Sequence, residues 1–424
     1  MSPAKPLPTL AVAAALALGS AVSLGLARFS YALLLPPMRA DLGWSYFVAG
    51  AMNTVNAAGY LAGALVTPSV LRRAGARVVF LAGLFVTALA LLGHGLVVED
   101  ATLYVLRFVT GVGSAATFVS GGLLAARLIG MPPGVRVKER ATASSGSTAA
   151  PTASENNTAS AGLVLGIYYG GTGVGIIASA LLVPALSERA LAHAWQGAWI
   201  GLAALAAVAL AITAAATRRL AAAEAPASAA AGSARSHFHW RPFAPALAAY
   251  LLFGLGYIGY MTFVISLLRE ERLASAVVVV FFVMLGAAVV ASSWLWAWLL
   301  QRSRGGGALA LLNALVAIAT VLPVLSVAPL AVFASGLLFG AVFLSLVAST
   351  TSLVRHNLAP AAWPAGIAAF TIVFAAGQIV GPSAVGFVAD HLGGLRAGFA
   401  GSAAVLALAA LVATRQRPLA PRPA

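Results

Sequence analysis

Long apolar blocks alternate with short polar connections along the whole chain of 424 residues. A helix that crosses the hydrocarbon core of a bilayer needs about 20 mostly apolar residues. Twelve blocks have that length, so the pattern predicts an all-α polytopic membrane protein with twelve transmembrane helices. The predicted spans are residues 10–35, 45–70, 78–98, 102–124, 162–186, 197–216, 244–268, 276–299, 308–327, 329–352, 366–389 and 395–413.

The number of predicted transmembrane helices depends on two stretches of the chain. The first block follows Lys5 and could be a secretory signal, but its apolar run is longer than a signal core and continues past Arg28, which favours a retained helix. The ninth and tenth blocks are separated only by Ala328-Pro329, and we expect a turn there.

Basic residues in the connections predict the orientation. If the chain starts on one side and alternates, 18 of the 25 Lys and Arg residues fall on the side of the amino terminus and five on the other. Cytoplasmic loops carry the excess of Lys and Arg. We therefore expect a multi-pass protein with both termini in the cytoplasm.

Composition excludes several classes of protein. The chain is 61% hydrophobic and 8% charged, and its mean hydropathy is +0.97. A soluble enzyme, a disordered chain and a nucleic-acid binder are excluded in spite of the net charge of +15. With no cysteine and no phosphate-loop motif, thiolate chemistry and an ATP-driven pump in one chain are excluded as well. We expect no enzyme, no cofactor and no metal, and a lipid bilayer as the solvent.

The chain is predicted to consist of two similar halves. Gly25–Tyr31 matches Gly254–Tyr260, and Gly171–Gly175 matches Gly377–Gly381, in the same order within each half. Such a repeat predicts two pseudo-symmetric six-helix bundles with a substrate site between them near the midplane. The expected domains are residues 1–216 with a disordered cytoplasmic insertion at 128–160, a linker at 217–241, and residues 242–424 with a short basic tail.

Arg28 is the clearest functional signal because it lies inside the first span. A charge near the bilayer centre costs about 2.5–3.5 kcal/mol on insertion scales, and no Asp or Glu lies well inside any predicted span. A guanidinium that faces a cavity can hold a carboxylate or a phosphate in a bidentate manner. The alternative is that Arg28 caps backbone carbonyls or reaches toward the interface. Arg107 in the fourth span has two interpretations, a role in the cavity or an arginine at the outer interface.

Other polar and aromatic residues lie on the inner faces of spans. Asn53, Asn56 and Tyr60 are spaced three and four apart on one face of the second span. Tyrosines can contact a substrate or pack in the interior, and Gln378 can contact a substrate or make an interhelical hydrogen bond. The expected substrate contacts are Arg28, Tyr31, Asn53, Asn56, Tyr60, Arg107, Tyr168, Tyr257, Tyr260 and Gln378.

Several stretches resemble the major facilitator superfamily. Arg107-x-x-x-Gly111-x-Gly113-x-Ala115 is similar to its helix-four motif, and Gly166–Gly175 to its helix-five motif. Gly63 through Arg77 is similar to its loop between helices two and three, although the loop aspartate is missing. Residues 27–45 with Asn53–Gly63 resemble the YbfB/YjiJ-like branch. The resemblance implies a major facilitator fold, alternating access, and gating roles for Arg72, Arg73, Arg77, Gly111, Gly113, Gly171, Gly175, Gly377 and Gly381.

These observations together predict a secondary active transporter of the bacterial inner membrane that moves a small organic solute, favoured to be anionic. A proton or a counter-substrate is the possible coupling partner. We expect the protein to work as a monomer. A broad-specificity exporter of drugs or metabolites, with a structural Arg28, is the first alternative. A membrane sensor or scaffold without transport is the alternative from another class.

Overall fold

Twelve long apolar helices account for most of the chain. The computed structural model describes residues 9–130, 153–188, 191–218 and 238–419, and these ranges contain helices and turns but no strand. The candidate membrane spans number twelve, which confirms the predicted fold class. They are Leu10–Leu42, Tyr46–Ala74, Ala76–His94, Asp100–Leu128, Leu163–Ser187, Ala194–Ala216, Arg241–Glu270, Ser275–Arg302, Gly307–Leu325, Pro329–Asn357, Pro360–His391 and Gly394–Ala413.

Some spans are built from more than one helical element. The N-terminal half contains α1 (Thr9–Ser20), the π-helix η1 (Ala21–Phe29), α2 (Tyr31–Leu42), α3 (Tyr46–Ala74), α4 (Ala76–His94), α5 (Asp100–Gly130), α6 (Ala153–Ser187) and α7 (Ala194–Ala216). The C-terminal half contains η3 (Arg241–Phe243), α8 (Ala244–Glu270), α9 (Ser275–Leu295), α10 (Ala297–Arg302), α11 (Gly307–Leu325), α12 (Pro329–Asn357), η4 (Pro360–Ala362), α13 (Trp363–His391) and α14 (Gly394–Ala413).

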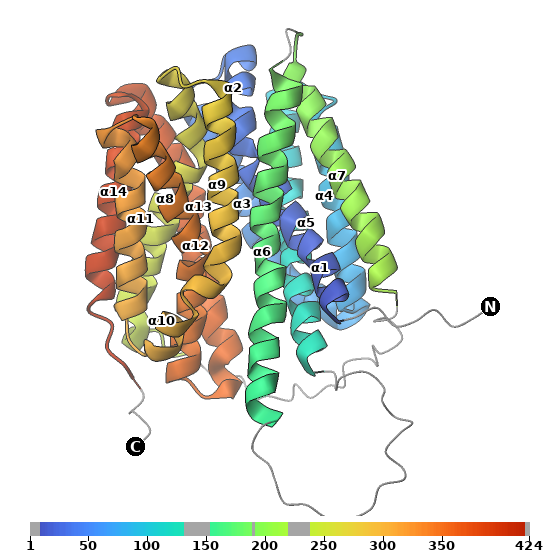
Figure 1. The fold of residues 1–424 in the computed structure, drawn as a ribbon, viewed down its shortest axis with the longest axis vertical. Coiled ribbons are helices and arrows are strands. Elements are labelled where there is room, and N and C mark those ends of the chain that lie inside the picture. The colour runs from blue at the N-terminus through green and yellow to red at the C-terminus, as the bar shows by residue number, and fades with distance from the viewer. Residues whose placement is uncertain (1–8, 131–152, 189–190, 219–237, 420–424) are drawn as a thin grey trace, which may run out of the picture.

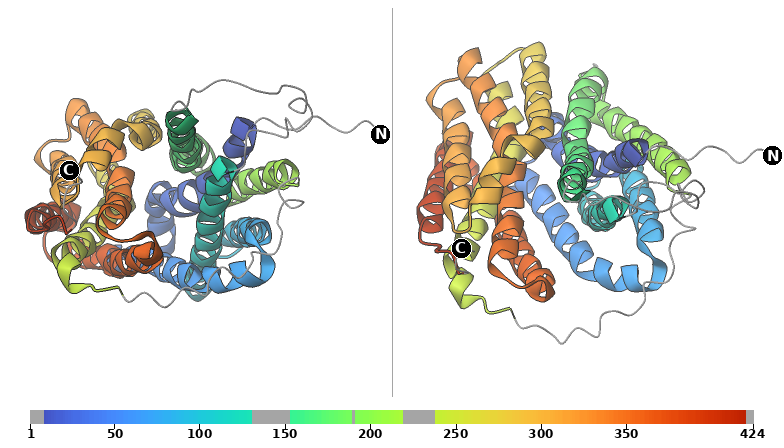
Figure 2. Two further views of the ribbon diagram at one scale, coloured as in Figure 1. Left: turned by 90° about the horizontal axis from the view of Figure 1, so that it is seen from below. Right: turned by 60° about the horizontal axis from the view of Figure 1, so that its bottom comes forward.

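The two halves stand side by side, with the N-terminal half in blue to green and the C-terminal half in yellow to red (Figure 1). Helix α6 packs along α9 and α3 packs along α13, so these two pairs form most of the contact between the halves. Figure 2 shows the same division from the end at which α1 begins and α14 ends. We call this end the termini side and the opposite end the far side.

The first span is longer than the sequence predicted. The Pro36-Pro37 pair does not end it, because α2 continues to Leu42 and stops at Gly43, which has a left-handed φ of 67°. Each proline removes one backbone donor, and membrane helices tolerate such losses where neighbouring groups satisfy the freed carbonyls. The predicted end at residue 35 is therefore wrong.

The two polar stretches are only partly described. Helix α5 runs to Gly130 and α6 begins at Ala153, so the predicted insertion 128–160 is too long at both ends. A hydropathy pattern cannot detect a helix that extends beyond the apolar core of its span. Residues 131–152 and 219–237, which hold the rest of the insertion and most of the predicted linker, lie outside the described residues.

Glycines set equivalent helix contacts in the two halves. A Cβ on Gly171 would lie 2.1 Å from the Ala17 carbonyl oxygen, so α6 touches the backbone of the first span. A Cβ on Gly377 would lie 2.3 Å from the Leu251 carbonyl oxygen, so α13 touches the backbone of the seventh span in the same manner. Small residues allow such close backbone approach in membranes. The matched glycine motifs therefore mark equivalent helix pairs.

Candidate functional site

Four of the predicted site residues meet in the middle of the bundle. Arg28, Tyr60, Tyr257 and Gln378 lie near the centres of the first, second, seventh and eleventh spans. Two come from the N-terminal half and two from the C-terminal half. The group therefore lies near the middle of the spans and between the halves.

A short chain of hydrogen bonds joins these residues. Arg28 Nη2 donates to Gln378 Oε1 at 2.9 Å, and Gln378 Nε2 donates to the Tyr257 hydroxyl. The Arg28 guanidinium carbon also lies 5.6 Å from the centre of the Tyr60 ring, within cation–π range. Gln378 thus connects the guanidinium of one half to a phenol of the other.

The charge of Arg28 is not neutralised within the described part of the chain. The Arg28 side chain is 4% exposed, and no ion pair to a described carboxylate is formed. Its Nε is buried without a hydrogen-bond partner there. Burial of a cation with one neutral partner is costly, so the site has the chemistry to accept an anion.

The π-helix η1 places Arg28 in this position. The Ser30 amide donates to the Gly25 carbonyl oxygen at 3.0 Å, five residues back, instead of to Leu26. The Leu26 carbonyl accepts the Ser30 hydroxyl at 2.5 Å. Gly25 permits the close approach of α6, because a Cβ there would lie 2.5 Å from the Gly175 Cα. Such π-helical turns are frequent at functional sites.

Arg107 has a different environment from Arg28. It is 1% exposed, and its guanidinium donates to the carbonyl oxygens of Met52 and Ala27 and to Asn53 Oδ1 at 3.4, 3.1 and 3.2 Å. Its guanidinium carbon lies 4.5 Å from the centre of the Tyr31 ring. The interfacial interpretation of Arg107 is therefore wrong, because the side chain is buried and caps backbone carbonyls.

The two predicted asparagines bind around Arg107. Asn53 Nδ2 donates to the Thr262 hydroxyl at 2.7 Å and so joins the halves a second time. Asn56 Nδ2 donates to the Arg107 carbonyl oxygen at 3.0 Å and stays within the N-terminal half. Asn53 therefore lies at the contact between the halves, whereas Asn56 fixes α3 to α5.

The remaining predicted tyrosines use their hydroxyls within their own halves. Tyr31 donates to the Ala49 carbonyl oxygen at 2.9 Å, and Tyr168 donates to that of Phe118 at 2.7 Å. Tyr260 shares a hydrogen bond of 2.7 Å with the Ser335 hydroxyl. None of these three bonds reaches the Arg28 group, so substrate contact by these tyrosines stays a prediction.

Aromatic rings that sequence reasoning did not select surround Tyr257. Its ring centre lies 4.7 Å from that of Phe253, 5.5 Å from that of Phe374 and 6.1 Å from that of Phe343. Phe29, next to Arg28, meets Phe343 edge to face at 5.7 Å. Phenylalanines are common core residues, so their positions along the chain gave no signal.

The residues with expected gating roles form two groups, glycines at helix contacts and arginines at the termini side. The glycines pack against backbone: a Cβ on Gly111 would lie 2.2 Å from the Asn56 carbonyl oxygen, and one on Gly113 would lie 3.0 Å from that of Gly83. Gly175 and Gly381 approach the carbonyl oxygens of Ala21 and Leu255 at 2.3 and 2.5 Å by the same measure.

The arginines of the second connection lie at the termini side. Arg72 donates to the Pro68 carbonyl oxygen and to Ser69, Arg73 is exposed, and Arg77 donates to Ala214 and Thr217 at the end of α7. Their described bonds stay within the N-terminal half, and a gating role for them remains a prediction.

Carboxylates at the far side form contacts that sequence reasoning missed. Asp390 accepts hydrogen bonds from the amides of Tyr46 and Phe47, and the Tyr46 hydroxyl binds Glu270. Arg269 forms an ion pair with Glu188 across the halves. The acids were visible at the predicted span ends, but a single sequence contains no signal for pairing across 344 positions.

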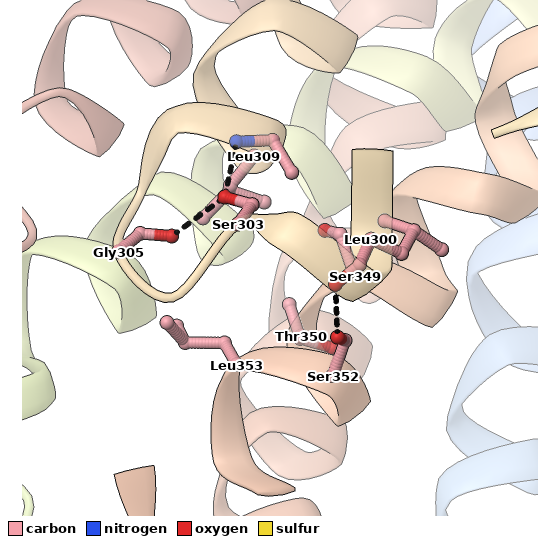
Figure 3. Close-up of a pocket in the computed structure, with 9 residues that line it drawn as sticks. Leu300, Ser303, Gly305, Leu309, Ser349, Thr350, Ser352 and Leu353 are labelled. Atoms are coloured by element: carbon pink, nitrogen blue, oxygen red, sulfur yellow. Dashed lines mark hydrogen bonds between the residues drawn. The ribbon is translucent and has the colours of Figure 1, made fainter. Parts of the chain in front are cut away.

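Two cavities lie away from the Arg28 group. One at the termini side, between α10, α11 and α12, has no space for a water molecule (Figure 3). In it Ser303 Oγ accepts from the Ala308 amide, and Ser352 Oγ donates to the Leu300 carbonyl oxygen. A larger one of about 240 Å³ lies at the far side and is lined by Leu33, Pro36, Pro37, Pro184, Ser187, Glu188, Ile265 and Arg269.

Comparisons with known proteins agree with this architecture. The sequence model of a family described as "Uncharacterised MFS-type transporter YbfB" matches residues 20–132 and 148–414. A search of curated proteins gives no match.

Two solved structures have a similar fold. A mutant of the nucleoside transporter NupG superposes with a TM-score of 0.72 and 13% identity, covering 95% of this chain and 100% of that one. A bacterial homologue of the human lysosomal transporter Spinster, in an inward-facing and unoccupied conformation, superposes with a TM-score of 0.69 and 14% identity, covering 95% and 96%. Identities this low establish the fold alone.

Proposed function

Because the chain belongs to the YbfB-type family of major facilitator superfamily transporters, we propose that it moves a small anionic organic solute across the bacterial inner membrane by alternating access. Both termini face the cytoplasm in this proposal, as the excess of basic residues on their side supports.

The observation that carries the proposal is the state of Arg28. This cation is nearly fully buried at mid-span. Among the described residues it has one hydrogen bond, to a neutral amide, and its Nε has no partner. A carboxylate or phosphate supplies the opposite charge and the acceptors that the guanidinium lacks. The same argument does not apply to Arg107, whose guanidinium has three acceptors.

The composition of the site supports coupling between binding and rocking of the halves. An anion on Arg28 competes with Gln378 for the guanidinium, so binding alters the Arg28–Gln378 link. Tyr257 and Tyr60 remain beside it as a hydrogen-bonding group and a ring face. A ligand can shift a conformational equilibrium only through such differential contacts.

A second candidate is a broad-specificity exporter in which Arg28 is structural. The rings of Phe253, Phe343 and Phe374 around Tyr257 favour it, because aromatic surfaces accept many apolar solutes. In that case uncharged aromatic solutes bind as well as anions, and neutralising Arg28 has little effect on affinity.

Ligand-induced thermal stabilisation distinguishes the candidates. We expect purified protein to be stabilised by members of a panel of organic carboxylates and phosphates, and not by their uncharged amide or alcohol analogues, because only a ligand of the folded state raises its stability. Arg28→Gln is expected to abolish the shift and Arg28→Lys to weaken it, since lysine lacks the planar fork. Arg415→Gln, at an exposed position with no expected role in binding or gating, is the matched control.

Flux in proteoliposomes completes the test. The stabilising anion is expected to accumulate or exchange in vesicles that contain the parent chain and not in those with Arg28→Gln. Equal stabilisation by the uncharged analogues would favour the second candidate, the broad-specificity exporter. Binding without flux in the parent would indicate a sensor instead of a transporter.

A further inference from the structure

The beginning of α3 is held by a carboxylate from the other half. Asp390, near the end of α13, accepts hydrogen bonds from the Tyr46 amide at 2.9 Å and the Phe47 amide at 2.7 Å. The first amides of a helix have no partner within the helix, and its N-terminus carries a partial positive charge. The Ser45 hydroxyl accepts the Val48 amide at 3.2 Å, and its carbonyl oxygen accepts the Ala49 amide. Asp390 therefore caps the two amides that come before these in α3.

A second carboxylate binds the same turn. The Tyr46 hydroxyl hydrogen-bonds Glu270 at the end of α8, and the Tyr46 ring lies under Arg39, whose guanidinium carbon is 3.7 Å from the ring centre. Arg39 Nε is buried without a partner in the described part of the chain. One residue of α3 thus contacts two acids of the C-terminal half and one cation of its own half.

Seven carboxylates lie at far-side ends of spans: Asp41, Glu99, Asp100, Glu188, Glu270, Glu271 and Asp390. Three of them, Glu188, Glu270 and Asp390, bind a residue of the opposite half. Glu271 pairs with Arg396 inside the C-terminal half, and Asp41 binds His193 and Trp195 inside the N-terminal half. The other charged or titratable groups described at these helix ends are Arg39, Tyr46, His94, Glu99, Asp100, Tyr104, Arg269, Arg272 and His391.

We propose that Asp390 and Glu270 form a latch on Tyr46 and Phe47 that keeps the far side closed. The Asp390 carboxylate accepts two amides and attracts the helix N-terminus. An uncharged amide side chain at this position has one acceptor oxygen fewer and loses that attraction. Removal of the charge therefore favours opening.

The cavity of about 240 Å³ at the far side is consistent with this movement. It lies between α2, α6 and α8, and the Arg269–Glu188 ion pair is part of its wall. Leu33 and Ile265, which line it, are 5% and 1% exposed. Separation of the halves at the latch opens this space. The inference does not rest on the proposed substrate, because it concerns only the contact between the halves.

Spin-label distances test the latch directly, since the chain has no cysteine. Leu96→Cys and Leu330→Cys place labels on far-side ends of opposite halves, at positions that are 65% and 83% exposed. In lipid nanodiscs at neutral pH we expect one short distance. Asp390→Asn is expected to raise the population with a longer distance on the order of tenfold, as loss of a charged cap does. Tyr46→Phe, which removes only the Glu270 bond, is expected to have a smaller effect.

Controls separate the latch from general loss of charge. Arg396→Gln breaks an ion pair at the same side but within one half, and it is expected to leave the distance unchanged. The double variant Asp390→Asn with Glu270→Gln is expected to show a long-distance population at least as large as that of Asp390→Asn alone. The latch is refuted if Asp390→Asn keeps the parent distance or Arg396→Gln lengthens it equally.

Discussion

Arg107 Nη1 donates a hydrogen bond of 3.1 Å to the carbonyl oxygen of Ala27, the residue that precedes Arg28. One buried arginine therefore fixes the backbone that carries the other. Arg107 belongs to α5, a different span from that of Ala27 and Arg28. The two intramembrane arginines thus have separate roles in our interpretation: Arg28 presents a charge, and Arg107 positions it.

This relationship predicts the effect of Arg107→Lys. Lysine cannot reach Met52, Ala27 and Asn53 together, and each buried group left unsatisfied costs about 1–3 kcal/mol. We expect the thermal midpoint of the purified protein to fall clearly, with Arg73→Lys as the exposed control. Affinity for the stabilising anion is expected to fall less than in Arg28→Gln. An unchanged midpoint with fully lost affinity would make Arg107 a direct ligand instead.

The two arginines show which parts of the fold and of the site can be predicted from the sequence. Span length, apolar composition and the repeated glycines predict twelve helices and two bundles, because these features follow from the solvent and from helix contact alone. The charge of Arg28 inside a span was equally visible. The hydrogen bond between Arg28 and Gln378 joins residues 350 positions apart. This bond, like the contacts of Arg107 with carbonyl oxygens, depends on how the spans are arranged in space. No local pattern in a single sequence shows that arrangement.

Replacing the neutral partner of Arg28 by an acid gives a second prediction. Gln378→Glu places a carboxylate 2.9 Å from the guanidinium, where the amide oxygen lies now. The new ion pair is expected to raise thermal stability and to abolish anion binding, because the charge is already neutralised. Gln378→Leu removes the competitor without adding charge, so anion affinity is expected to be kept or increased. Retained anion affinity in Gln378→Glu would show that the substrate does not use Arg28.

The orientation in the membrane is tested by labelling in intact cells. Leu96→Cys lies at the far side and Arg415→Cys at the termini side, and both positions are exposed. If the termini are cytoplasmic, a membrane-impermeant maleimide added outside labels Leu96→Cys and leaves Arg415→Cys unmodified until the cells are opened. The parent chain gives no background because it has no cysteine. The reverse pattern would invert the proposed topology.

The matched glycines predict equal effects in the two halves. Gly171→Ala brings a Cβ to 2.1 Å from the Ala17 carbonyl oxygen, and Gly377→Ala brings one to 2.3 Å from that of Leu251. Backbone must move in both cases, and such overpacking costs about 1–3 kcal/mol. Both variants are expected to lower the thermal midpoint and the rate of transport.

Gly401→Ala in α14 is the control for these two variants, since no atom lies within 4 Å of its new Cβ. Alanine in a helix is about 1 kcal/mol more favourable than glycine, so this variant is expected to be neutral or slightly stabilised. The comparison separates helix propensity from helix contact, because all three substitutions change propensity in the same direction. A stabilised Gly171→Ala would mean that α6 does not touch the first span as closely at Ala17 as the structure has it.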